Sequence, residues 1–219
     1  IAAAVETEKL SRVDLYGIGT NLTCFSFIQA DEEKMERLAE MRKKVENAAG
    51  HTLEIVSGGN SAALDLMMRG GICEGVDNFR LGESLLFGKE RSRYTFLPGT
   101  RNDGFILECE VVEAKVKPSL PWGTAGVDSY GRKPVFTNRG EKRKKVICAI
   151  GRQDFDAETA TPVDEGILIL GASSDHLMLD VTDSVKEYKV GDIVELRLGY
   201  FSVLRAFTSP YVEKIFLKK

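Results

Sequence analysis

Two short stretches place glycines beside hydroxyl or charged side chains where a strand ends and a helix begins. The first, SGGNS, ends at Ser61, and the second, RLGES, begins at Arg80. Backbone N–H groups at a helix start lack partners within the helix and attract anions, and a serine hydroxyl adds a donor. One such stretch is more typical of a simple helix cap. Two on consecutive strand–helix units favour a site for a phosphorylated ligand.

Arg80 poses a separate question, because it interrupts the apolar run NFRLGESLLFG. A guanidinium at the end of a buried strand is costly unless it meets a partner. Either it belongs to a structural ion pair, or it faces an electron-rich group at the end of the strand. The residues alone leave both possibilities open.

Other polar groups have a structural interpretation that outweighs a catalytic one. Tyr130 lies in SYGRK, beside a turn, where a tyrosine is most often an amphipathic surface residue or a hydrogen-bonding core residue. Asp175 and His176 follow two serines, which is typical of turn chemistry rather than of a Ser–His–Asp site. No nucleophile-elbow spacing occurs, so a hydrolase is poorly supported.

The chain alternates strands and helices before about residue 98. We predict strands at Val13–Gly17, in TLEIVSGG and in VDNFRLG. Between them, a helix is expected from Asp31 as N-cap to a stop at Gly50, and shorter helices follow Asn60 and begin at ESLLFG. This order predicts parallel β/α units, with ligands at the carboxyl ends of the strands.

The pattern changes after the Leu97–Pro98 junction. Five β-rich runs follow, separated by glycine, proline, asparagine and aspartate, with no long helical period. The run GYFSVLRAFTSPYV, which contains Tyr200, could form a plain strand. We therefore predict β/α units over residues 1–97 and a mostly antiparallel β domain, a barrel or sandwich, over residues 98–219.

Composition excludes several classes of protein. The net charge of −3 implies no general attraction to nucleic acid, and the basic run at residues 139–145 is predicted to be a solvated turn. No apolar stretch reaches the ~20 residues that span a bilayer. Four cysteines without CxxC spacing and only two histidines disfavour a metal site and fit reduced thiols in the cytoplasm.

Seven motifs, in this order, resemble those of the fold-type III pyridoxal-phosphate amino-acid racemases, the alanine-racemase-like family, and most closely its ornithine racemase branch. They are GIGTNLTCF, VSGGNSAAL, FRLGESLLFG, SYGRK, AIGRQDFD, GASSDHLMLDV and GYFSVLRAFTSPYV. They run nearly the whole length of the chain. The resemblance implies a (β/α)8 barrel followed by a β domain, the architecture expected above.

The resemblance also implies how the cofactor is held. Arg80 would face the pyridine nitrogen, and since a guanidinium essentially never gives up its proton, it can donate to that nitrogen but cannot protonate it. A cofactor ring whose nitrogen is not protonated favours racemisation over transamination or decarboxylation. Asn21 stands where relatives have a histidine that supports this arginine. The residues implied for the phosphate are Ser61, Gly82, Glu83 and Tyr200.

Racemisation needs two bases on opposite faces of the α-carbon. The resemblance assigns one to the cofactor lysine and the other to Tyr130, which in the family reaches the partner's site across a head-to-tail homodimer. The loop with Ser174 and Asp175 likewise reaches toward the substrate carboxylate. Arg152 replaces a family tyrosine and is expected near the substrate.

Part of the family pattern is absent. No segment matches the cofactor-lysine motif, and a whole barrel takes ~250 residues. We therefore expect the N-terminal half of the barrel, with that lysine, to lie outside this chain, and we expect the chain alone not to turn over.

Several functions remain open. The first is a racemase of ornithine or another basic amino acid, whose distal ammonium Asp154 or Asp156 could meet. An alanine racemase, or a non-catalytic pyridoxal-phosphate-binding protein of the same fold, is the alternative. A binding domain for oligosaccharide or nucleic acid would need interleaved aromatic residues on the β strands, which are not evident.

Overall fold

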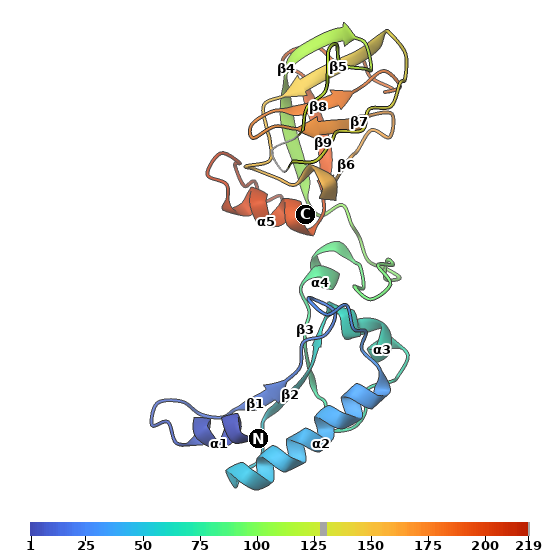
Figure 1. Ribbon diagram of the computed structural model, residues 1–219. Coiled ribbons are helices and arrows are strands. Elements are labelled where there is room, and N and C mark those ends of the chain that lie inside the picture. The colour runs from blue at the N-terminus through green and yellow to red at the C-terminus, as the bar shows by residue number, and fades with distance from the viewer. Residues whose placement is uncertain (128–130, 219) are drawn as a thin grey trace. The chain divides into compact units, whose positions relative to one another are not determined.

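The computed structural model describes residues 1–127 and 131–218 and divides into two compact units. The N-terminal unit is Ile1–Asn102 and the C-terminal unit is Asp103–Lys219. Figure 1 shows a helix-flanked sheet in the first and a β-rich body in the second.

Three parallel strands form the sheet of the N-terminal unit, in the order β1 (Gly17–Gly19), β2 (Ile55–Asn60) and β3 (Asn78–Arg80). The helices of this unit are α1 (Ala2–Glu8), α2 (Glu32–Ala49), the 3-10 turn η1 (Ser61–Ala63), α3 (Leu64–Met68) and α4 (Glu83–Phe87). The predicted alternation of strands and helices is therefore present.

Helix α2 begins and ends where the sequence predicts. The Asp31 side chain accepts a hydrogen bond from the Lys34 N–H at 2.9 Å, and Gly50 ends the helix in the left-handed region with a φ of 81°. The buried face of α2 presents Met35 to a core cluster that also contains Val56, Leu66 and Val76.

The first strand begins at Gly17, so the predicted start at Val13 is wrong. Only Gly17–Gly19 pairs with β2, whereas the side chains of Val13 and Tyr16 are exposed. The strand can approach β2 here because a Cβ on Gly17 would lie 2.2 Å from the Ile55 carbonyl oxygen.

Six antiparallel strands form the sheet of the C-terminal unit, in the order β6-β9-β4-β5-β8-β7. Its edge strands β6 and β7 contact each other, so the sheet nearly closes into a barrel. The strands are β4 (Ile106–Lys117), β5 (Arg143–Cys148), β6 (Ala160–Pro162), β7 (Leu168–Ala172), β8 (Leu177–Asp180) and β9 (Ile193–Leu198). The predicted β domain is confirmed.

Alternation along the strands builds the core of this unit. Leu107, Cys109 and Val111 of β4 point inward, between exposed neighbours. The antiparallel partner β9 buries Val194 and Leu196 on the same side. Full burial of such a side chain stabilises the fold by about 1.5–3 kcal/mol.

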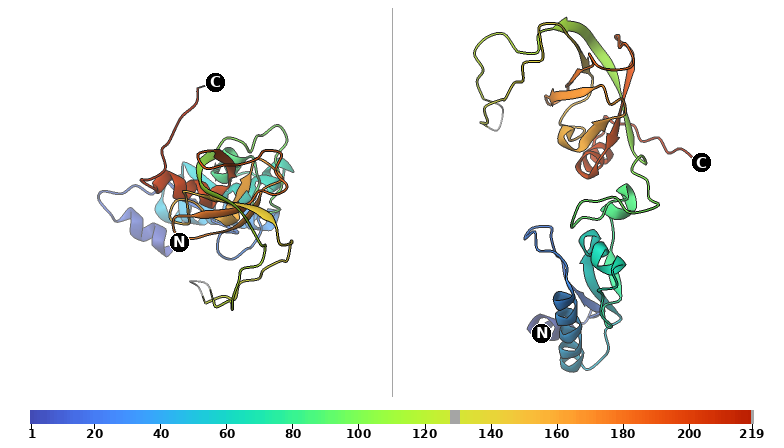
Figure 2. Two further views of the ribbon diagram at one scale, coloured as in Figure 1. Left: turned by 90° about the horizontal axis from the view of Figure 1, so that it is seen from above. Right: turned by 90° about the vertical axis from the view of Figure 1, so that its right-hand side faces the viewer.

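The run from Gly199 forms a helix rather than a strand. Helix α5 (Tyr200–Thr208) follows β9, and it buries Ser202, Val203 and Ala206, which recur at helical spacing. The Ser202 hydroxyl anchors the helix to the turn η2 (Ala157–Thr159) by a 2.9 Å contact with the Thr159 hydroxyl. The side view in Figure 2 shows α5 beside the sheet of this unit.

Two features are absent from the described residues. No helix there has both the length and the apolar character that a bilayer crossing requires. No group of three or more histidine, cysteine, aspartate or glutamate side chains in residues 1–127 and 131–218 is arranged to hold a metal. The four cysteines are free thiols.

Candidate functional site

The carboxyl ends of β1, β2 and β3 meet at one edge of the parallel sheet. Hydrogen bonds connect the residues that follow each strand, so three loops distant in sequence form one polar surface. This is the edge where the strand–helix pattern predicts a ligand.

Arg80 ends β3, and its side chain turns back across the other two strands. Its Nη1 atom donates to the Ser57 hydroxyl at 2.5 Å, and Nη2 donates to the Thr20 carbonyl oxygen at 2.8 Å. No ion pair joins Arg80 to a carboxylate within the described residues. Arg80 is exposed, so the structural ion pair that the sequence left open is not formed there.

Asn21, which stands at the place of the family histidine, has no hydrogen bond to Arg80 within the described residues. The Asn21 Oδ1 atom instead accepts from Asn60 Nδ2 at 2.9 Å. The Asn60 Oδ1 atom accepts from the Ala62 N–H at 2.8 Å, the cap that the sequence predicts. Asn21 therefore fixes the loop that precedes Ser61, while its neighbour Thr20 and the unpredicted Ser57 support the guanidinium.

Ser61, Gly82 and Glu83 lie together, as the two motifs predict. The Ser61 hydroxyl oxygen accepts from the Gly82 N–H at 3.4 Å and the Ser84 N–H at 3.2 Å. It also lies 3.1 Å from the Ser84 hydroxyl, a second buried hydroxyl that sequence reasoning missed. The Glu83 side chain pairs with Arg91 at 3.4 Å, which leaves its backbone N–H as the group suited to a ligand.

This donor set fits pyridoxal phosphate. Serine hydroxyls and the start of α4 suit a phosphate, and the guanidinium of Arg80 suits a ring nitrogen that accepts a hydrogen bond. A Cβ on Gly82 would meet no described atom within 4 Å, so space remains open beside these donors. Ser61, Gly82, Glu83 and Arg80 are the residues of this unit that would hold the group.

In the C-terminal unit, the structure brings together Arg152 and the loop with Ser174 and Asp175. The Arg152 N–H donates to the Ser173 carbonyl at 2.9 Å, and Arg152 Nε donates to the Ala172 carbonyl at 2.9 Å. A Cβ on Gly151 would lie 2.4 Å from the Ser174 carbonyl oxygen. Glycine therefore permits the close approach of these two segments.

Asp175 organises its own turn. Its Oδ1 atom accepts from the Ser173 hydroxyl at 3.2 Å and the Ser174 hydroxyl at 3.1 Å, and it lies 3.0 Å from His176 Nδ1. The contact with His176 is the largest cause that lowers the pKa of the Asp175 carboxyl. Both serine hydroxyls donate to the aspartate, and Ser173 also bonds to the His176 backbone, but neither hydroxyl bonds to the imidazole ring, so no Ser–His–Asp relay forms here.

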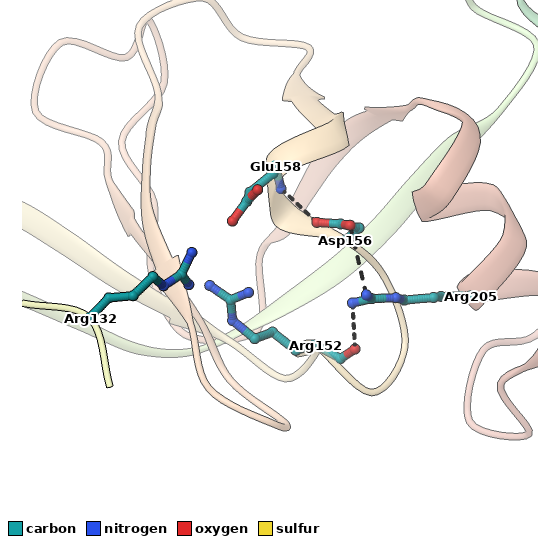
Figure 3. Close-up of a pocket in the computed structure, with 5 residues that line it drawn as sticks. All are labelled: Arg132, Arg152, Asp156, Glu158 and Arg205. Atoms are coloured by element: carbon teal, nitrogen blue, oxygen red, sulfur yellow. Dashed lines mark hydrogen bonds and ion pairs between the residues drawn. The ribbon is translucent and has the colours of Figure 1, made fainter. Parts of the chain in front are cut away.

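A cavity of about 400 Å³ opens beside Arg152. Figure 3 shows the side chains that line it. Asp156 Oδ2 lies 3.8 Å from Arg205 Nη2, and its Oδ1 atom accepts from the Glu158 N–H at 3.1 Å. The Glu158 carboxylate itself has no donor among residues 1–127 and 131–218. The residues that line the cavity are Arg132, Arg152, Asp156, Glu158 and Arg205.

Asp154 cannot meet a distal ammonium, contrary to one sequence hypothesis. It is buried, and its Oδ1 atom accepts from the buried Ser209 hydroxyl at 2.7 Å. Asp156 is engaged with Arg205, so Glu158 is the cavity carboxylate that remains available, a residue that sequence reasoning missed. Its position two residues after Asp156, on the short turn η2, was the signal that could have found it.

The roles of two further predicted residues stay untested. Tyr130 lies outside the described residues. Tyr200 is the first residue of α5, and its ring packs edge-on against Phe201 with centroids 5.5 Å apart. The predicted phosphate contact of Tyr200 stays a proposal.

Comparison with known proteins found two related sequences and no matching family model. The chain is 45% identical over 209 residues to an ornithine racemase of Acetoanaerobium sticklandii, covering 95% of this chain and 59% of that protein. It is 42% identical over 214 residues to a lysine racemase of Thermotoga maritima, covering 98% and 60%. The chain thus spans about three-fifths of the length of these relatives.

Solved structures share the fold at low sequence identity. An alanine racemase from Clostridium difficile in complex with cycloserine has a TM-score of 0.52 at 22% identity, over 92% of this chain and 52% of that chain. A Bartonella henselae alanine racemase with covalently bound pyridoxal phosphate has a TM-score of 0.53 at 20% identity, over 90% and 51%. A D-threonine aldolase from Filomicrobium marinum reaches 0.57 at 11% identity, over 94% and 50%.

These matches confirm the predicted fold class, the later units of a β/α barrel followed by an antiparallel β domain. They also confirm the resemblance that the seven motifs carry. Sequence and fold together place the chain in the fold-type III family of alanine-racemase-like proteins.

Proposed function

We propose that the full-length protein is a pyridoxal-phosphate-dependent racemase of ornithine or another basic amino acid. The observation that carries this proposal is 45% and 42% identity, along nearly the whole chain, to proteins named ornithine racemase and lysine racemase. The exposed donors at the edge of the parallel sheet support the cofactor. The free cysteines are in keeping with a cytoplasmic protein.

The residues of the N-terminal unit bind and tune the cofactor. Pyridoxal phosphate supplies an electron-withdrawing ring that stabilises negative charge developing at the α-carbon. Ser61 and the N–H groups of Gly82 and Glu83 would bind its phosphate. Arg80 would donate a hydrogen bond to the ring nitrogen while keeping its own proton, so it would not protonate that nitrogen.

Proton transfer itself belongs to a pair of bases. Tyr130 takes or returns the proton on one face of the α-carbon, and the cofactor lysine serves the other face. A phenol has an ordinary pKa of ~10, so Tyr130 needs a cationic neighbour, for which Arg152 is a candidate. In a head-to-tail homodimer, Tyr130 and the Ser174–Asp175 loop reach the partner's site.

One carboxylate in the arginine-rich cavity of the C-terminal unit could meet the distal ammonium of a basic substrate. Arg152 suits the carboxylate of an amino acid, whereas the Glu158 carboxylate has no described donor and suits an ammonium group. Asp156 is already engaged with Arg205. We therefore assign Glu158 to the distal ammonium of a diamino acid.

The decisive test uses the full-length protein. We expect a visible absorbance that borohydride fixes onto a lysine, and racemisation of ornithine or lysine faster than of alanine. Faster racemisation of alanine would identify an alanine racemase. Bound cofactor without racemisation of any amino acid would identify a non-catalytic binding protein. Absence of the absorbance would reject all three functions.

A further inference from the structure

The hydrogen bonds of Arg80 leave most of its donors unused. A guanidinium carries five N–H groups in a rigid plane. One N–H of Nη1 is directed to Ser57 and one of Nη2 to Thr20, so three have no acceptor in the described part of the chain. The two bonds that are formed fix the plane of the group and thereby the direction of the three that remain.

The support beneath the guanidinium is built with little freedom. Ser57 is 6% exposed and pairs in register with Gly19 on the neighbouring strand. A Cβ on Gly19 would lie 3.1 Å from the Ser57 Cβ atom and 3.3 Å from Arg80 Nη1. The Thr20 N–H donates to the Ser57 carbonyl at 2.9 Å. This bond holds Thr20, whose own carbonyl oxygen accepts from Arg80. Glycine at this position leaves the room in which the guanidinium lies.

Both acceptors are uncharged, and this decides how much charge the guanidinium retains. A hydroxyl and a backbone carbonyl orient the group without neutralising it, whereas a carboxylate in the same place would form an ion pair. Neither acceptor titrates near neutral pH. The cation therefore stays available to an electron-rich group at the edge of the sheet.

We propose that Ser57 is a positioning residue that holds Arg80 against the ring nitrogen of the cofactor, the part first expected of Asn21. Gly19 contributes to this positioning, because its lack of a side chain leaves the space that the Arg80 guanidinium occupies. This inference rests on the proposed function and deepens it, because it names what sets the electronics of the cofactor in this chain.

A double-mutant cycle in the full-length protein tests the proposal. We expect Ser57→Ala to lower kcat by about 10- to 100-fold, the range for a lost hydrogen bond to a charged group. We also expect a shifted absorbance maximum of the bound cofactor, with little change in KM. In an Arg80→Lys background the same change should have almost no further effect, because Ser57 acts through Arg80. Ser92→Ala, which removes another hydroxyl of the same unit, should alter neither quantity.

A second pair of variants isolates charge from shape. Ser57→Asn and Ser57→Asp have nearly the same size, so any loss of folding should be common to both and visible in thermal unfolding. We expect only Ser57→Asp to shift the absorbance further, because a carboxylate pairs with the guanidinium. Equal spectra for the two variants would contradict the role of uncharged support.

The outcomes separate this inference from the proposed function. A wild-type protein without cofactor absorbance would reject the proposed function itself. A wild-type protein that binds cofactor and racemises, but in which Ser57→Ala and Arg80→Lys act additively, would overturn only the role of Ser57.

Discussion

The two units use opposite structural strategies. The N-terminal unit has short parallel strands, a small core cluster around Met35, and N–H groups of the Arg80 guanidinium that have no acceptor among the described residues. The C-terminal unit has longer antiparallel strands, a continuous core and a buried carboxylate, Asp180, that is fully engaged with Arg143 and Thr182.

This difference indicates where chemistry and stability reside. Unused donors suit ligand binding, and they occur where the backbone leaves a parallel sheet. The N-terminal unit also exposes Phe25 and Phe27 at 94% and 82%, which a self-contained sheet would cover. The C-terminal unit buries its core side chains within its own sheet and contributes to function through its loops. We expect changes in the first unit to alter the cofactor and changes in the second to alter turnover, selectivity or folding.

Tyr130→Phe should have the largest effect of the changes that test this division of roles. Removing a general base typically slows a reaction by about 10²–10⁴-fold. Because Tyr130 belongs to the C-terminal unit, we expect kcat to fall by this factor while the absorbance of the bound cofactor stays unchanged. Tyr211→Phe, at an exposed tyrosine of the same unit, serves as the control. Unchanged racemisation of ornithine, lysine and alanine would remove Tyr130 from the two-base mechanism.

Leu179→Ala tests whether the C-terminal unit unfolds independently of the N-terminal unit. Leu179 is fully buried on β8, and removing such a side chain costs about 2–5 kcal/mol of unfolding free energy. Amide hydrogen exchange resolved by peptide should accelerate in β5, β7 and β8 and remain unchanged in β1–β3. Acceleration spread equally over both units would show that they unfold as one cooperative body.

Acidification should weaken the C-terminal unit through Asp180. Burial alone would raise the pKa of this carboxyl, but hydrogen bonds from Arg143 and Thr182 outweigh it and hold the pKa below its ordinary value. The folded-state pKa therefore lies below the unfolded one, ~3.9. The stabilisation is complete above pH ~4 and is lost as the pH falls through the folded-state pKa.

Thermal unfolding against pH, compared between wild type and Asp180→Asn, measures this contribution. Hydrogen bonds to a charged group contribute about 1.5–3 kcal/mol. We expect the wild type to lose this advantage in acid and the variant to show a flatter profile. An identical slope in both proteins would assign the acid sensitivity to other carboxylates.

Glu158→Gln should have the smallest effect and is the most specific test. Loss of one ammonium–carboxylate contact is expected to lower kcat/KM for ornithine and lysine by about tenfold, or ~1.4 kcal/mol, and to leave alanine unchanged. Glu165→Gln removes the same charge at an exposed site that does not line the cavity and should change neither. A loss shared equally by charged and neutral substrates would contradict recognition of the distal ammonium by Glu158.

Much of the framework was predictable because local signals agreed with the fold. Asp31 and Asn60 cap the elements that follow them, Gly50 stops α2, and Ser61 lies against Gly82, as their spacing indicates. Position in a strand–helix unit is sufficient for such expectations, since the groups that interact are close in sequence or at the same strand end.

The residues that sequence reasoning misplaced interact across long separations. Ser57 and Arg80 are 23 residues apart, and Asp154 reaches Ser209 across 55 residues. An asparagine at the place of a family histidine indicated a partner for Arg80, but the amide of Asn60 engages Asn21 instead. Several neighbouring donors compete for each acceptor, and their positions in space decide which hydrogen bond forms.

The sequence by itself determined the alternation of strands and helices from Gly17 to Phe87, the edge of the sheet at which donors gather and the family to which the motifs point. These follow from periodicity, caps and turns, which are short-range properties of the chain. The tertiary structure alone decided that neutral groups support Arg80, that Asp154 is a core residue and that Glu158 is the available carboxylate. Hydrogen-bond partners and burial are set by packing between distant segments, which no local pattern encodes.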